Sequence, residues 1–190
     1  MQRSCSVRPV AEQSSHRLDA TPKFMERKIK DTPPRLPVVF QNYDPPLFLV
    51  TFNTLLRRPL LACEPVHAAF RDYAERGLAF HIATGRYVLM PDHIHVFVRI
   101  GRDVTLRRWE SGLKQRLGKV LAGLGHEPTT IPGSKIKSFW QPGFFDHLLR
   151  HDESYAQKWD YVWRNPARAG LVANPADWPY QGEIQRIDRV

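Results

Sequence analysis

Two histidines separated by one residue, His93 and His95, are the first side chains whose spacing in this sequence suggests chemistry. They lie in the run HIHVFVRI, whose apolar and β-branched residues are typical of a β-strand. Because strand side chains alternate between faces, both imidazoles should point the same way. An imidazole pair on one face can bind a divalent cation or a phosphate. A partly exposed polar strand face would explain the pair equally well.

A tyrosine and an asparagine four residues apart form a second candidate pair. Tyr161 and Asn165 lie in a segment expected to be helical, where this spacing stacks two side chains on one face. Tyr161 falls off the apolar stripe of that helix, so its phenol is not required as core filler. A surface tyrosine is the ordinary alternative, and Asn165, directly before Pro166, would serve equally as a residue that ends the helix.

The elements that must position these residues follow from the hydrophobic periodicity. We expect strands over residues 47–54, 80–90, 93–100 and 138–145, and helices over residues 64–76, 105–121 and 152–164. This order predicts an α+β fold: a ferredoxin-like βαββαβ antiparallel sheet with an added C-terminal helix that carries Tyr161. Such sheets serve many functions, so the fold alone does not decide the activity.

Composition divides the chain into two parts. Residues 1–46 hold seven of the sixteen prolines and no lasting apolar period, which predicts a Pro-rich, largely disordered N-terminal arm. Residues 47–190 are the expected folded domain. Two cysteines exclude a disulfide scaffold and a cysteine-built zinc site. No run approaches the ~20 apolar residues of a membrane span, so we expect a cytoplasmic protein with no membrane partner.

The charge balance favours a polyanionic partner. Twenty-eight Lys and Arg against nineteen Asp and Glu give a net charge of +9, which suits nucleic acid first and an acidic membrane surface second. Part of this excess falls on the helix expected over residues 105–121. A solvated helix face would explain it as well as DNA binding does. The candidate contacts to DNA phosphates are Arg107, Arg108, Lys114, Arg116 and Lys119.

Taken together and in chain order, these motifs resemble the single-tyrosine HUH transposases, in particular the REP-associated tyrosine transposases. The segment YVLMPDHIHVFV at 87–98 is similar to their His-hydrophobic-His core, and FWQPGFFDHLLR at 139–150 to their aromatic strand. The segment YVWRNPARAGLV at 161–172, followed by Asp-Trp-Pro at 177–179, resembles their C-terminal part. The resemblance spans roughly residues 47–183. One departure is Asp92, where many relatives have asparagine, and it leaves both histidines in place.

The resemblance implies a role for each matched residue. His93 and His95 match the histidines that hold a divalent metal in the family, and Asn165 matches the third ligand. The implied metal is Mg²⁺ or Mn²⁺, although two imidazoles and an amide would also suit Zn²⁺. Tyr161 matches the catalytic tyrosine, which attacks a phosphate of single-stranded DNA. The product in the family is a 5′-phosphotyrosine link and a free 3′-hydroxyl.

The expected function is therefore DNA transposition or recombination chemistry. We expect a metal-dependent single-stranded DNA endonuclease and strand transferase acting at palindromic, REP-like hairpins, in a nucleoid-associated protein that is a monomer or a homodimer. The first alternative is a domesticated protein that binds hairpin DNA or RNA without cutting it. The second is a replication or conjugation initiator built on the same sheet, which the single tyrosine and the short chain disfavour.

Overall fold

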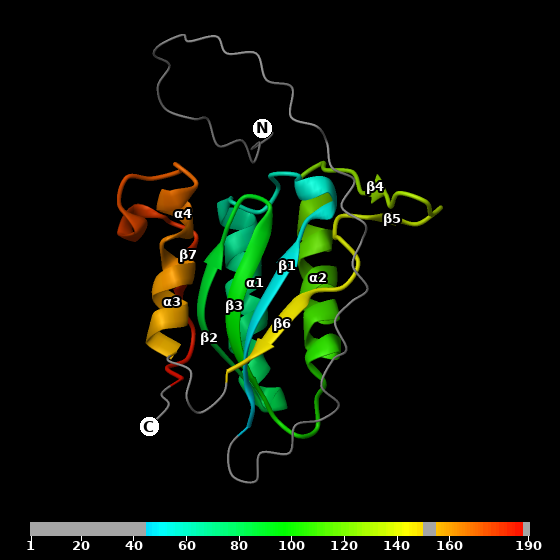
Figure 1. The fold of residues 1–190 in the computed structure, drawn as a ribbon. Helices are drawn as coiled ribbons and strands as arrows, with labels where there is room; N and C mark the ends of the chain where they lie inside the picture. Colours follow the sequence, from blue (N-terminus) through cyan, green and yellow to red (C-terminus); the bar gives the residue numbers. More distant parts are fainter. Residues whose placement is uncertain (1–44, 150–154, 188–190) are drawn as a thin grey trace.

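The computed structural model describes residues 45–149 and 155–187 (Figure 1). Its strands are β1 Leu47–Asn53, β2 Ile82–Leu89, β3 His93–Ile100, β4 Thr129–Thr130, β5 Lys137–Ser138, β6 Phe145–Leu148 and β7 Gln181–Glu183. Its α-helices are α1 Glu64–Arg76, α2 Leu106–Gly123, α3 Tyr155–Trp163 and α4 Asn165–Arg168, and its 3-10 helices are η1 Leu55–Arg57, η2 Gly77–Phe80 and η3 Pro175–Asp177. The predicted N-terminal arm lies outside the described residues except for Pro45 and Pro46, so its boundary stays a prediction.

Five strands form one antiparallel sheet in the order β6-β1-β3-β2-β7 (Figure 1). The first four of these strands, with α1 and α2 in the connections, confirm the predicted ferredoxin-like βαββαβ arrangement. The central pair β1 and β3 is in register from Leu47 opposite Arg99 to Asn53 opposite His93. Strand β7 extends the sheet beyond β2 and was not predicted.

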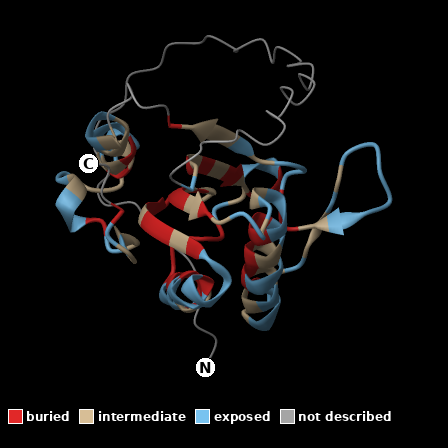
Figure 2. Ribbon diagram, turned by 90° about the horizontal axis from the view of Figure 1, so that it is seen from below, coloured by how far each residue is buried: buried red, intermediate tan, exposed pale blue. Residues whose placement is uncertain are grey.

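Helices cover the sheet on both faces (Figure 1). On one face, Ile94, Val96 and Val98 of β3 are fully buried in the core cluster that also holds Phe70 of α1 and Leu113 of α2. The opposite face is covered by α3. Figure 2 shows the buried residues gathered in the sheet and on the helix surfaces turned toward it. Within the described ranges, no helix is long and apolar enough to cross a bilayer.

Gly85 lies within β2, whose register with β3 shifts between Thr84 and Tyr87. A Cβ atom at Gly85 would lie 2.8 Å from Cδ1 of Ile187 and 3.3 Å from the hydroxyl of Tyr155. A side chain here would therefore have to displace Ile187, because α3 and the C-terminal segment approach the backbone of β2.

The aromatic strand expected over residues 138–145 is wrong in its position. The sheet strand that follows α2 is β6, and the residues before it form only β5 and an isolated bridge between Thr54 and Trp140. Gly143, at φ +75°, takes the turn between the two. Trp140 packs edge-on against Phe52 and its indole Nε1 donates to the carbonyl of Lys114 at 2.9 Å. These aromatic residues are apolar because they fill the core beside α2, and an apolar aromatic run has the composition of a strand.

The short helix η1 contains two consecutive residues in the left-handed region, Leu56 at φ 57° and Arg57 at φ 56°. Neither is glycine, and Leu56 is 63% exposed, so burial of its side chain does not compensate for the backbone strain. The turn is fixed at its base. The hydroxyl of Thr54 donates to the carbonyl of Arg58 at 2.7 Å, and the amide of Leu55 donates to the carbonyl of Phe139 at 2.7 Å.

Replacing Leu56 by glycine tests this strain. A left-handed residue other than glycine costs ~1–2 kcal/mol, and glycine loses ~0.5–1 kcal/mol more entropy on folding. We therefore expect Leu56→Gly to raise the free energy of unfolding by about 0.5–1 kcal/mol in urea denaturation. The control is Leu78→Gly, which replaces an exposed leucine of η2 outside the left-handed region and should destabilise the protein. If both substitutions lowered the free energy of unfolding equally, the proposed backbone strain at Leu56 would be contradicted.

A buried histidine links α1 to the sheet. His67 lies with its Nε2 2.8 Å from the hydroxyl of Tyr87 on β2, and its ring also contacts Tyr180 edge-on. Burial raises the pKa of Tyr87 to about 12, so its hydroxyl stays protonated and donates to His67. Burial also lowers the pKa of His67, against the opposing charge of Glu64. The imidazole of His67 is therefore neutral in the folded protein.

The buried neutral histidine predicts acid sensitivity. The unfolded chain takes up a proton at His67 below pH ~6.5, whereas the folded chain resists it, so stability should fall as the pH drops below that value. In His67→Gln, which lacks the titrating group, we expect a shallower loss of unfolding free energy between pH 7 and 5, measured by urea denaturation in chelator. The exposed-site control His81→Asn should keep the wild-type slope. A His67→Gln slope equal to the wild-type slope would contradict the prediction.

Candidate active site

His93 and His95 lie on one face of β3, as their spacing predicts. Both are half-buried, while Ile94 and Val96 between and beyond them are fully buried on the opposite face. The two imidazole rings are perpendicular, at 88°, with centroids 4.7 Å apart. The requirement that β3 bury its apolar residues under α1 and α2 thus places both imidazoles together on the other side of the sheet.

Hydrogen bonds outside the ring pair determine which nitrogen of each ring is available. Nδ1 of His93 lies 2.6 Å from a carboxylate oxygen of Asp92. Hydrogen bonding and charge from His93, together with the charge of Arg57, hold the pKa of Asp92 below its usual value even though burial of the carboxyl opposes this shift. The carboxylate can only accept, so Nδ1 of His93 carries a proton toward Asp92, and Nε2 is the ring nitrogen left for a metal. This arrangement is the one that commonly orients a metal-binding histidine.

His95 is oriented by the neighbouring strand. Thr51 of β1 stands opposite His95 in the register, and its hydroxyl lies 2.8 Å from Nδ1 of His95. Burial, with the nearby charges of His93 and Arg57, lowers the pKa of His95 to about 3. The ring is therefore neutral near pH 7, which is the protonation state that can bind a metal.

Tyr161 comes from α3 and Asn165 from α4. Their segment was predicted as one helix, but it breaks at Arg164, so Asn165 begins the short helix α4 rather than ending the longer one. Asp152, the expected start of the helix, lies outside the described residues. Val162 is buried against the sheet, whereas Tyr161 is 60% exposed. The phenol therefore lies off the packing face, as the apolar stripe indicates.

All four predicted site residues line one hollow of about 560 Å³ within a single chain. The hollow lies between the His93 end of β3 and the α3–α4 pair. A phenol, two imidazoles and a carboxamide therefore line the same space. The lining residues are Thr51, Asn53, Arg57, Met90, His93, His95, Tyr161, Asn165, Arg168 and Ala169.

The residues at this hollow fit a divalent metal. Each histidine has its Nδ1 engaged by a neighbour, which leaves both Nε2 atoms as donors of lone pairs. In the part of the chain that the structure describes, no three His, Cys, Asp or Glu side chains gather as a metal site. A third protein ligand would therefore have to be of another type; Asn53 and Asn165 both line the hollow, and Asn165 is the one that the family resemblance implies.

Two arginines at this hollow were not among the predicted site residues. Arg168 of α4 lies over the ring of Tyr161, with its guanidinium carbon 4.5 Å from the ring centroid. Its position seven residues after Tyr161 could have indicated a shared helix face. Arg57 approaches from the strained turn η1, and its side chain is half-exposed. No local pattern predicts a left-handed conformation at this arginine.

The five basic residues proposed to contact DNA divide into different environments. Lys114 is only 12% exposed: its ammonium group pairs with Glu110 at 2.5 Å and donates to the carbonyl of Gly143 at 2.7 Å. This lysine fastens the loop before β6 to α2, and its contact with a DNA phosphate stays a prediction. Arg116 lies 3.4 Å from a carboxylate oxygen of Asp72 on α1. The remaining three, Arg107, Arg108 and Lys119, are exposed.

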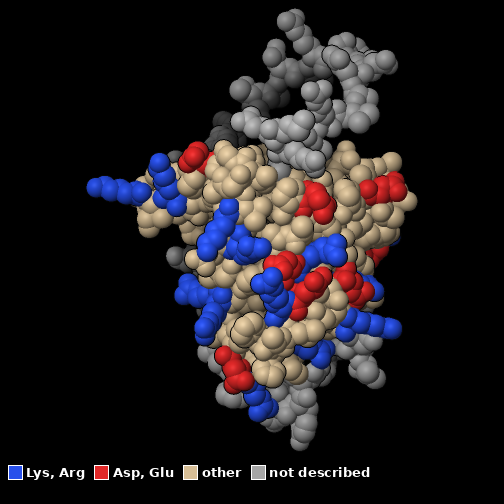
Figure 3. Space-filling model, turned by 180° about the vertical axis from the view of Figure 1, so that it is seen from behind, with Lys and Arg blue, Asp and Glu red and all other residues tan. Residues whose placement is uncertain are grey.

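The placement of α2 separates Arg107 and Arg108 from the hollow. Helix α2 begins at the end of the sheet where β3 ends, so these two residues lie at the opposite end from His93 (Figure 1). On the face shown in Figure 3, Lys and Arg side chains stand among Asp and Glu rather than forming one continuous basic patch. Contact of the α2 residues with DNA stays a prediction.

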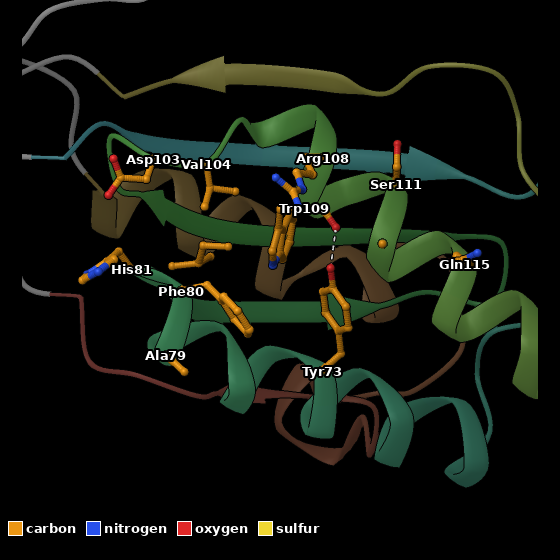
Figure 4. A pocket seen from close by; sticks show the side chains of 12 residues that line it. Tyr73, Ala79, Phe80, His81, Asp103, Val104, Arg108, Trp109, Ser111 and Gln115 are labelled. Carbon is orange, nitrogen blue, oxygen red and sulfur yellow. Dashed lines mark hydrogen bonds between the residues drawn. The ribbon is translucent and has the colours of Figure 1, made fainter.

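A second hollow of about 830 Å³ lies between α1 and the start of α2 (Figure 4). Aromatic and aliphatic side chains line much of it, including Phe80, Val104 and Trp109, with Arg108 at its edge. The hydroxyl of Tyr73 donates to the carbonyl of Trp109 at 2.9 Å across it. None of the predicted catalytic or metal-binding residues lies there.

Comparisons with known proteins agree with the resemblance of the motifs. No family model matches the chain. It is 29% identical over 96 residues to a REP-associated tyrosine transposase of Escherichia coli, an alignment that covers 50% of each chain. It is 28% identical over 97 residues to a putative REP-associated tyrosine transposase of Haemophilus influenzae, covering 48% of this chain and 53% of the relative. The chain thus spans about half the length of the curated relatives it matches.

The fold is similar to a solved structure of a REP-associated tyrosine transposase bound to a REP hairpin. The TM-score is 0.52 at 20% sequence identity, and the match covers 80% of this chain and 98% of that one. At this identity the likeness concerns the fold, and the sequence matches supply the relationship. In sequence over half its length and in fold, the chain is thus similar to REP-associated tyrosine transposases.

Proposed function

We propose that this protein is a metal-dependent endonuclease and strand transferase for single-stranded DNA at palindromic hairpins, acting through a 5′-phosphotyrosine intermediate. The observation that carries the proposal is the single hollow lined by Tyr161, His93, His95 and Asn165. The relative whose structure holds a REP hairpin supports hairpin DNA as the partner. The net charge of +9 is consistent with such a partner.

In this proposal the chain performs a transfer of a phosphodiester. The hydroxyl oxygen of Tyr161 attacks the phosphorus of a DNA phosphate, and the bond from phosphorus to the 3′ oxygen breaks to release a 3′-hydroxyl. The strand that carries the 5′-phosphate remains on Tyr161, so a 3′-hydroxyl can later reverse the step and join strands without a nucleotide cofactor. The exposure of the phenol leaves room for the DNA strand on the open side of the hollow.

The His93, His95 and Asn165 side chains would hold Mg²⁺ or Mn²⁺. When bound, such an ion neutralises charge on the phosphate and positions it for attack. Asp92 and Thr51 orient the two imidazoles, and the neutral state of His95 keeps its lone pair available near pH 7. Because these residues and Tyr161 belong to one chain, a monomer contains every proposed site residue.

A covalent adduct tests the nucleophile. Purified protein is incubated with Mn²⁺ and a panel of single-stranded palindromic hairpins of varied sequence, and adducts are resolved by denaturing electrophoresis. We expect an adduct with wild-type protein and none with Tyr161→Phe, which lacks the attacking oxygen but keeps the ring. Tyr180→Phe is the control outside the hollow and should form the adduct. Hairpin binding that is unchanged by chelator and by Tyr161→Phe, without any adduct, would instead identify a binding protein.

Removal of the metal or of one ligand tests the metal dependence. We expect chelator to abolish the adduct and His95→Gln to slow its formation by about 10²-fold or more, because charge on the attacked phosphate is no longer neutralised. Calorimetric titration with Mn²⁺ should show one site per chain in the wild-type protein and much weaker binding in His95→Gln. His81→Asn serves as the histidine control. Adduct formation at the same rate in chelator would contradict the metal requirement.

A further inference from the structure

The strained turn η1 holds the guanidinium of Arg57 beside the histidine pair. Its Nε lies 2.7 Å from a carboxylate oxygen of Asp92, and its Nη1 donates to the side-chain oxygen of Asn53 at 2.6 Å. Its Nη2 lies 3.3 Å from Nδ1 of His93. Arg57 is thus fixed at two nitrogens and still lines the hollow that contains Tyr161.

The donors of Arg57 exceed the acceptors around it. A guanidinium has five N–H groups and accepts no hydrogen bond. Nη2 of Arg57 lies 3.3 Å from Nδ1 of His93, which can accept at most one of its two protons. At least one N–H of Nη2 is therefore not donated to His93. A half-exposed cation with such a donor at the edge of this hollow is suited to bind an anion.

The backbone at Arg57 indicates that this position is required by function. Arg57 and Leu56 both take the left-handed conformation, which glycine or asparagine would adopt at lower cost. Leu56 is exposed, so the turn is not maintained by burial of its side chain. What the turn achieves is the placement of the Arg57 side chain over Asp92 and His93. Strain kept at a turn that lines a site is typical of functional positions.

We propose that Nη2 of Arg57 binds a non-bridging oxygen of the DNA phosphate that Tyr161 attacks. This inference rests on the proposed function, and it adds a phosphate-binding residue to the site. The guanidinium would neutralise part of the charge that develops on the phosphate oxygens as the phenol attacks. Because Asp92 and Asn53 hold the guanidinium of Arg57 in place, little side-chain entropy is lost when the phosphate binds.

The competing explanation is that Arg57 only positions other groups. It contacts Asp92, which orients His93, so its removal would disturb the imidazole pair without any contact to DNA. A loss of activity alone does not separate these roles. The separating property is the negative charge of the phosphate, which matters for direct binding and not for the orientation of His93.

A binding measurement gives the first test and does not depend on cleavage. Affinity for a hairpin with a single-stranded extension is measured by fluorescence anisotropy at several salt concentrations, in chelator, with Tyr161→Phe protein. Adding Arg57→Gln should weaken binding about tenfold and reduce the slope of log affinity against log salt by about 0.7, the value for one phosphate contact on a single strand. Adding Arg76→Gln, which also removes an arginine paired to an aspartate, should leave the slope unchanged. An unchanged slope with Arg57→Gln overturns the inference.

A modified substrate gives the second test. At the mapped cleavage position, one non-bridging oxygen is replaced by methyl to give an uncharged methylphosphonate. With wild-type catalytic tyrosine, Arg57→Gln should slow adduct formation on the normal linkage by about 10²-fold, and by less than about fivefold on the methylphosphonate. Equal penalties on both linkages would show that Arg57 only positions other groups, and would overturn the inference. If thermal denaturation shows that Arg57→Gln does not fold, Arg57→Lys is used in its place. Lysine keeps the positive charge and loses the planar guanidinium. It should slow adduct formation on the normal linkage by less than the ~10²-fold expected for Arg57→Gln.

The outcomes for the two proposals are separate. If wild-type protein forms no adduct but Arg57→Gln lowers the salt slope, the phosphate site stands and the cleavage function fails. If wild-type protein forms the adduct, and Arg57→Gln changes neither the salt slope of hairpin binding nor the rate of adduct formation, the cleavage function stands and the phosphate site fails.

Discussion

The pairing of β3 with β1 is the interaction on which the rest of the site depends. It assigns Ile94, Val96 and Val98 to the face under α1 and α2, where each is fully buried. Burial of one such side chain is worth about 1.5–3 kcal/mol, so the core strongly fixes the register. A slip by one residue would turn His93 and His95 into that core. The same register sets Thr51 beside His95, so core packing and imidazole orientation have one cause.

The second face of the sheet places Tyr161 by a separate set of contacts. Phe97, the next residue of β3 on the histidine face, packs edge-on against Tyr155 and Trp159 of α3 with centroids 4.6 and 6.4 Å away. Arg86 of β2 lies over both of those rings and pairs with Glu183 of β7 at 3.4 Å. These contacts hold α3 along the sheet. Tyr161 is therefore positioned by the residues on the helix face opposite to its own.

Sequence periodicity predicted the parts of the fold that depend on local burial. The helix over residues 64–76 and the strand over 93–100 have the predicted bounds, because their apolar residues follow the periods of a helix and a strand. The grouping of Tyr161 with His93 was also predicted, but through family resemblance. Strand β7 was missed, since Gln181–Glu183 has no strand pattern and forms only by pairing with β2. The arginines of the hollow were missed because Arg57 depends on a tertiary turn, and the bond from Lys114 to the carbonyl of Gly143 could not be predicted because that loop is distant in sequence.

The close approach at Gly85 has a consequence for how the chain can be altered. Ile187 lies in one buried cluster with Phe97 and Leu149, and Tyr155 and Trp159 pack against that cluster. The residues after Trp178 therefore support the helix that bears Tyr161, although none of those described lines the hollow. Trimming the chain there, or fusing a bulky partner directly to it, would displace the phenol while every proposed site residue remained present.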